Sequence, residues 1–171
     1  MKALIVFYSR TGNTRKVAHA IAESLRDSGG AEVTLEEIVD KKKRSGLLGW
    51  LRAGRDATLK RPTEIEETKA DVSAFDLVIV GTPVWAWTAT PAVGTFLKRF
   101  AETIDRAAFF CTYGSSGAGS TFNKMKEILG KEPVATLALT ARQVKKEHPE
   151  DYAVKIEEFA AGLARALSGD G

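Results

Sequence analysis

The chain has 171 residues, 44% of them hydrophobic and 27% charged, which is enough apolar material for one globular domain over residues 1–171 and excludes extended disorder. No run approaches the ~20 apolar residues of a membrane-spanning helix, residues 1–7 are too short for a secretory signal, and a single cysteine excludes an internal disulfide. The formal net charge is only +3, so we expect a cytoplasmic protein whose partners depend on where the charge lies.

The first 38 residues predict a strand, a helix and a second strand. Residues 2–8 form a nearly unbroken apolar run, as in a strand that is buried on both faces of a parallel sheet. A helix over residues 14–28 follows, because apolar side chains recur at helical spacing and Gly29-Gly30 provides a stop. Residues 31–38 alternate in polarity, which indicates another strand.

The positive charge is concentrated in residues 41–61, between the second and third predicted strands. This segment has eight cations and one anion, a net charge of +7, which leaves −4 for the rest of the chain. Apolar residues alternate with the cations, so residues 46–52 predict a short amphipathic helix. Three interpretations stay open: a surface helix packed on the domain, a docking surface for an acidic partner protein, and contact with an anionic membrane surface.

The rest of the chain continues the alternation of strands and helices. Residues 75–80 form a third strand that ends at Gly81-Thr82-Pro83, and a helix begins at Pro91 with Thr90 as its cap. Later patterns predict, in order, a strand over 107–113, a turn over 114–119, a helix over 121–129, a strand over 134–140 and a closing helix from Pro149. We therefore expect an α/β fold, with a five-stranded parallel sheet covered by helices on both faces.

Ligands of such sheets bind beyond the carboxyl ends of the strands, at the point where the strand order reverses. The first of three loops at this edge offers three hydroxyls, an amide side chain and a glycine at the start of a helix. Unpaired backbone amides and the helix dipole favour an anion there, and hydroxyls suit a terminal phosphate monoester. The loop consists of Ser9, Arg10, Thr11, Gly12, Asn13 and Thr14.

Residues 9–14 do not match the common nucleotide-binding loops. No Gly-Lys-Ser/Thr follows, which disfavours a Walker loop, and the loop does not contain the Gly-x-Gly-x-x-Gly turn of dinucleotide-binding proteins. A helix that is capped by its own Ser/Thr-rich turn, without a ligand, remains an alternative.

Residues 5–21 resemble the flavodoxin signature throughout. The match includes an apolar pair, an aromatic residue, a Ser/Thr, a glycine, a second threonine, an alanine and a final aliphatic residue. The stretch reads Ile5-Val6-Phe7-Tyr8-Ser9-Arg10-Thr11-Gly12-Asn13-Thr14-Arg15-Lys16-Val17-Ala18-His19-Ala20-Ile21. The resemblance implies strand order 2-1-3-4-5, with flavin mononucleotide (FMN) at the junction of the first and third strands, and flavodoxin is itself the general example of this placement. The uninterrupted last strand resembles short-chain flavodoxins, and residues 41–61 depart from the family as a basic insertion.

The other two loops suit a flat cofactor ring. Residues 82–91 contain two tryptophans whose indole faces can cover a heteroaromatic ring, although one of them can instead cap the edge of the core. Residues 112–119 are glycine-rich and let backbone amides approach a ligand; the flavodoxin resemblance implies contact with the pyrimidine edge of the flavin. The candidate cofactor-binding residues of these loops are Thr82, Pro83, Val84, Trp85, Ala86, Trp87, Thr112, Tyr113, Gly114, Ser115, Gly117 and Gly119.

Side chains that suit acid–base, nucleophilic or metal chemistry form no recognisable pattern. Cys111 has the apolar neighbours Phe109 and Phe110, which indicates a buried, inert thiol. His19 and His148 have no nucleophile or acid partner in the sequence. We therefore expect no catalytic side chain and no metal site.

The resemblance implies an FMN-binding, flavodoxin-like electron carrier in which the protein holds the flavin and the flavin performs the redox chemistry. Its partners would be redox proteins, docking at the basic segment, and we expect no nucleic acid. Two alternatives stay open: an NAD(P)H-dependent quinone or flavin reductase of the same fold, and a flavin-free interaction domain.

Overall fold

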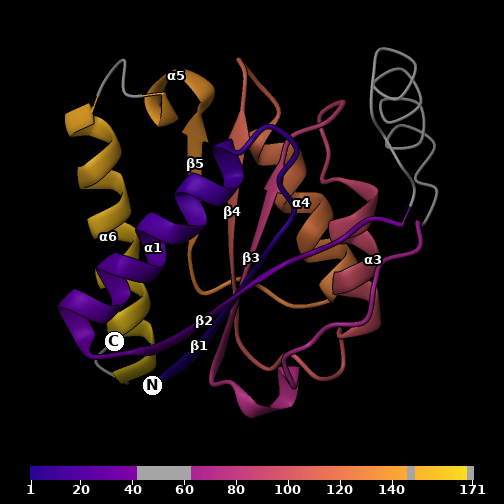
Figure 1. The fold of residues 1–171 in the computed structure, drawn as a ribbon, viewed down its shortest axis with the longest axis horizontal. Coiled ribbons are helices and arrows are strands. Elements are labelled where there is room, and N and C mark those ends of the chain that lie inside the picture. Colours follow the sequence, from indigo (N-terminus) through magenta and orange to yellow (C-terminus); the bar gives the residue numbers. More distant parts are fainter. Residues whose placement is uncertain (42–62, 146–148, 169–171) are drawn as a thin grey trace.

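The computed structural model describes residues 1–41, 63–145 and 149–168. Its centre is a sheet of five parallel strands in the order β2-β1-β3-β4-β5 (Figure 1). The strands are β1 (Lys2–Phe7), β2 (Glu32–Glu37), β3 (Leu77–Pro83), β4 (Ala107–Tyr113) and β5 (Thr136–Thr140). The predicted fold class and strand order are confirmed.

Helices cover both faces of the sheet (Figure 1). On one face lie α1 (Asn13–Gly29), α5 (Ala141–Val144) and α6 (Pro149–Ser168), and α1 packs along α6. On the other face lie α3 (Pro91–Arg99) and α4 (Ala118–Leu129), which pack on each other, while the short 3-10 helix η1 (Val72–Ala74) leads into β3. Each face thus has its own hydrophobic core.

The unbroken apolar run of β1 follows from this three-layer arrangement. Successive side chains of a strand point to opposite faces, so Ile5 and Phe7 join the core under α1 and α6, whereas Leu4 and Val6 join the core under α3. All four side chains are at most 3% exposed.

Several boundaries differ from the sequence predictions. The third strand continues to Pro83, because Gly81, Thr82 and Pro83 pair with the neighbouring strand β4. The helix predicted from residue 121 begins at Ala118, since Gly117 adopts a left-handed backbone with φ of 100°. The last strand begins at Thr136, two residues later than predicted.

Helix α5 was not predicted, because four residues are too short to show a periodic apolar pattern. Its start is fixed by a capping box, in which the Thr140 hydroxyl accepts from the Gln143 amide and the Gln143 side chain accepts from the Thr140 amide. By contrast, the predicted start of α3 is confirmed, with Thr90 as cap and Pro91 at the first helical position.

The amphipathic helix predicted over residues 46–52 and the residue His148 lie outside the described residues. No helix within 1–41, 63–145 and 149–168 is long and apolar enough to cross a membrane.

Candidate functional site

The three predicted loops come together at the carboxyl edge of the sheet, the upper edge in Figure 1, where β1, β3 and β4 end. The first and third loops are joined by a hydrogen bond of 2.9 Å between the hydroxyls of Thr14 and Thr112. The first and second loops meet where the rings of Tyr8 and Trp85 pack edge to face, 5.5 Å apart. The sheet order therefore places residues far apart in sequence in one site.

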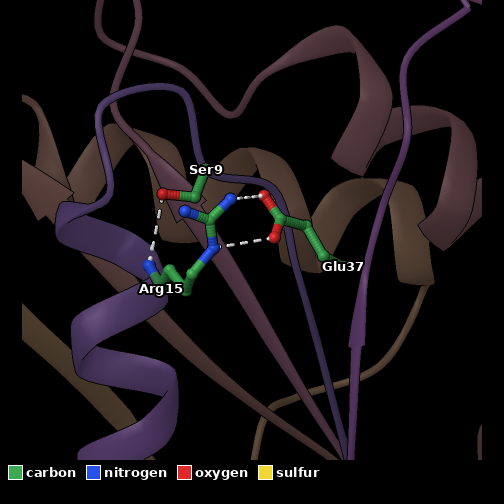
Figure 2. A network of polar contacts seen from close by, with 3 residues as sticks. All are labelled: Ser9, Arg15 and Glu37. Atoms are coloured by element: carbon green, nitrogen blue, oxygen red, sulfur yellow. Dashed lines mark hydrogen bonds and ion pairs between the residues drawn. The ribbon is translucent and has the colours of Figure 1, made fainter.

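The first loop leaves the start of α1 open to an anion. Gly12 occupies the N-cap position with φ of 89°, a left-handed conformation that favours glycine, and its lack of a side chain means that α1 has no side-chain cap hydrogen bond at this position. One capping contact is nevertheless present, because the Ser9 hydroxyl accepts the amide N–H of Arg15 at 3.2 Å (Figure 2). The alternative of a helix that is capped by its own loop therefore holds in part. These features fit a phosphate group at the end of the helix dipole.

Arg15 and Glu37 add a charged pair that the sequence did not reveal. Nε and Nη2 of Arg15 donate to the Glu37 carboxylate at 2.9 and 2.8 Å, a bidentate contact between α1 and the end of β2. Figure 2 shows the Arg15 guanidinium between Glu37 and Ser9, so its remaining nitrogen lies on the side of the first loop. Arg15 follows the loop directly in sequence, but no local signal identifies Glu37 as its partner.

Thr14 and Thr112 are the buried members of the site, with 2% and 5% exposure. A hydroxyl can donate one hydrogen bond while accepting another. When Thr112 donates to Thr14, the Thr14 proton is therefore free for a phosphate oxygen.

Thr82 holds the second loop together from within. Its hydroxyl donates to the Pro83 carbonyl at 2.9 Å and accepts the Thr90 amide at 3.1 Å. The residue is 0% exposed, so the structure gives Thr82 a supporting role in this loop.

The second loop then turns back on itself in a tight hairpin. Trp85 and Thr88 exchange two backbone hydrogen bonds of 3.0 and 3.1 Å. The two residues at the turn, Ala86 and Trp87, have φ of 47° and 59°. These values are typical of a type I′ turn, in which Asn and Gly are the usual residues.

The two tryptophans have different surroundings. The Trp85 ring packs against Tyr8 in a T-shaped pair, and the Arg10 guanidinium of the first loop lies over the Trp85 ring, 5.9 Å from its centroid. Trp87 is 67% exposed, and its indole N–H donates to the Ser116 hydroxyl at 3.2 Å.

Two residues that were not predicted both bond Trp87: Ser116 in the third loop and Ser120 in the first turn of α4. Single serines in a glycine-rich turn carry no sequence signal for such a contact. Of the predicted residues, Gly114, Ser115 and Gly119 are exposed at the surface of this loop, and Tyr113 is half-buried at the end of β4.

Cys111 is buried in β4, as predicted from its apolar neighbours. Burial raises the pKa of its thiol to about 12, so the thiol is protonated at neutral pH and a poor nucleophile. Cys111 therefore belongs to the core and takes no part in the site.

A cavity of about 290 Å³, lined by no residue of the three loops, lies between β2 and residues 65–69. The Glu36 carboxylate in its wall accepts the amides of Lys69 and Ala70 at 2.7 and 2.9 Å. Because the Glu36 carboxylate already accepts two backbone amides, we interpret the cavity as a gap left where residues 63–70 pack on the edge strand β2.

The fold and the three loops define a flavodoxin-like flavoprotein. Residues 1–147 match the model of a protein family described as NADPH-dependent FMN reductase, and the chain belongs to this family. The predicted family relationship and the predicted FMN ligand are thereby confirmed.

Two similar curated proteins are both named NAD(P)H dehydrogenase (quinone). The protein from Archaeoglobus fulgidus is 27% identical over 111 residues, covering 61% of this chain and 52% of the relative. The protein from Syntrophobacter fumaroxidans is 36% identical over 84 residues, covering 48% of this chain and 40% of the relative. The chain thus spans about half the length, or less, of these relatives.

Among solved structures, a flavoprotein from Lactobacillus acidophilus in complex with FMN has a TM-score of 0.68 at 21% identity. The match covers 85% of this chain and 97% of that chain. At this identity the likeness supports the fold.

Proposed function

We propose that the chain is an FMN-dependent reductase that takes electrons from NAD(P)H and passes them to a quinone or a flavin. The observation that carries this proposal is the hydroxyl-lined start of α1, whose N-cap residue Gly12 makes no side-chain cap hydrogen bond, together with the second and third loops at the edge where β1 and β3 end. The family described as NADPH-dependent FMN reductase, and the names of the curated relatives, support the reductase over the electron carrier that the sequence favoured.

The proposed role of the protein is to bind and orient FMN. The helix dipole of α1 and the hydroxyls of Ser9, Thr11 and Thr14 bind the phosphate of FMN. The second loop covers the ring, and backbone groups of the glycine-rich third loop contact its edge. Bound FMN supplies the hydride and electron chemistry, so no side chain has to act as an acid or base.

Further residues of the three loops belong to the same proposal. Arg10 and Asn13 border the phosphate, and the other loop residues form the wall around the ring. These wall residues are Pro83, Val84, Trp85, Ala86, Trp87, Tyr113, Gly114, Ser115, Gly117 and Gly119. We also propose that residues 1–171 form one domain and that redox partner proteins dock at residues 41–61, most of which lie outside the described residues.

Purified protein tests the proposal through flavin binding and turnover. We expect FMN to bind more tightly than riboflavin, and the FMN-loaded protein to oxidise NADPH when a quinone is added. Colourless protein that shows no binding in an FMN titration would support the flavin-free alternative and overturn the proposal.

A further inference from the structure

The hairpin in the second loop has a backbone that its own sequence does not favour. Ala86 and Trp87 both adopt positive φ, at 47° and 59°. A residue with a Cβ, and a bulky one above all, is rarely found in this region, so the surrounding structure has to hold it there.

The third loop and the first turn of α4 provide the contacts that hold the turn. The Ser120 hydroxyl lies 2.6 Å from the Trp87 carbonyl and 3.1 Å from the Gly117 carbonyl, and it can donate to either. At the other end of the same residue, the indole N–H of Trp87 donates to the Ser116 hydroxyl at 3.2 Å. Trp87 is thus fixed through both its backbone and its side chain.

Gly117 allows this close approach. Its φ of 100° favours glycine, and a Cβ at this position would lie 2.9 Å from Cγ1 of Val84 and 3.1 Å from Cα of Trp87. A larger residue would therefore push the second loop away from the third.

These contacts leave Trp87 largely exposed. An indole that is anchored through its N–H has a fixed position, and Trp87 is nevertheless 67% exposed. The Trp85 ring, by contrast, already contacts Tyr8 and Arg10. Of the two tryptophans, Trp87 is the one prepared to stack on a planar ring.

We propose that Ser120 and Ser116 are positioning residues that hold Trp87 in its left-handed turn, so that its indole forms a fixed wall against the planar flavin ring. This inference rests on the proposed function and deepens it, because it selects one of two tryptophans and adds two serines outside the predicted site. Part of the test of this inference needs no flavin, so the inference and the proposed function can fail separately.

The first experiment measures the mobility of Trp87 in flavin-free protein. Trp50→Phe and Trp85→Phe together leave Trp87 as the only tryptophan. In this background, Ser120→Ala should lower the fluorescence anisotropy of Trp87 and increase its quenching by acrylamide, and Ser120→Thr should restore both because it keeps a hydroxyl. Asn123→Ala, at an exposed position on the same helix, is the control and should change neither.

The second experiment measures FMN affinity in the otherwise unchanged chain. Trp87→Ala should raise the Kd of FMN about three- to tenfold, the size expected for one aromatic contact. Ser120→Ala should raise it in the same direction, and Ser120→Thr should recover it.

The inference is overturned if Ser120→Ala leaves the anisotropy of Trp87 unchanged, or if Trp87→Ala leaves the Kd of FMN unchanged. Failure of the unmodified protein to bind FMN would instead overturn the proposed function and the flavin wall together. The anisotropy of Trp87 would still decide whether Ser120 holds the turn.

Discussion

At the scale of single residues, Thr14 links the proposed phosphate site to the core, since its buried hydroxyl bonds Thr112. Thr14→Val should weaken FMN binding by ~1.5 to 3 kcal/mol, the range for a hydrogen bond to a charged group, and should weaken riboflavin binding far less. Titration of both ligands measures the difference.

Thr112→Val is the matched control for Thr14→Val, because it removes the same buried Thr14–Thr112 hydrogen bond but leaves the Thr14 hydroxyl in place. If both variants lose FMN and riboflavin affinity equally, the hydroxyl of Thr14 serves the fold alone and the phosphate assignment is wrong.

We propose that Arg15 and Glu37 act on the FMN phosphate through charge. The pair is half-exposed, so each partner should change FMN affinity by no more than about fivefold, equivalent to ~1 kcal/mol. Arg15→Gln removes a cation beside the first loop and should weaken FMN binding, whereas Glu37→Gln leaves that cation uncompensated and should strengthen it. Titrations at low and high salt should show both effects shrinking as salt rises.

Riboflavin, which has no phosphate, is the reference ligand for the Arg15 and Glu37 variants. Equal changes for FMN and riboflavin, or changes of the same sign in both variants, would contradict a phosphate role for Arg15.

At the scale of elements, the close packing of β3 against β4 depends on Gly81. A Cβ added there would lie 2.0 Å from the tip of the Phe110 ring on the paired strand. Because Phe110 is fully buried, Gly81→Ala should lower the free energy of unfolding by at least ~1 to 3 kcal/mol, the usual cost of overpacking. Urea unfolding measures this loss.

Gly162 in α6 is the matched control, since a Cβ there meets nothing within 4 Å. Gly162→Ala should raise stability by ~0.5 to 1 kcal/mol through helix propensity. A Gly81→Ala variant as stable as the unmodified chain would show that the Phe110 ring can shift to admit a methyl group.

The long elements could be predicted because each carries its own apolar pattern. The run in β1 and the helical spacing in α1 reflect burial on the two cores, so the local sequence contains the information. The end of β3 could not be predicted, because the pairing of Pro83 with Thr112 is a property of the neighbouring strand.

At the scale of the whole molecule, the site depends on contacts between distant segments. The residues of the first loop were predicted from the sequence, but the links from this loop and from Arg15 to Thr112, Glu37 and Trp85 require the strand order. The Ser116 and Ser120 contacts with Trp87 were missed for the same reason. A single sequence shows which loops carry suitable groups and does not show which groups meet.

The basic segment, residues 41–61, carries a net charge of +7, whereas the rest of the chain carries −4. We propose that it selects an acidic redox partner, so neutralising Lys41, Lys42, Lys43 and Arg44 together should slow electron transfer to an acidic acceptor protein and reduce the salt dependence of the rate. Rates that respond to neither salt nor these substitutions would exclude the segment from docking.

The most direct test of the reductase proposal is anaerobic stopped-flow mixing of the FMN-loaded protein with NADPH and, separately, with NADH. We predict rapid, complete bleaching of the flavin by one equivalent of a nicotinamide, followed by recovery of the colour when a quinone is added. Two results together would contradict the reductase proposal and favour the electron carrier instead. The flavin would stay oxidised with both nicotinamides, and it would accept a single electron from a chemical reductant and remain stable in the one-electron-reduced form.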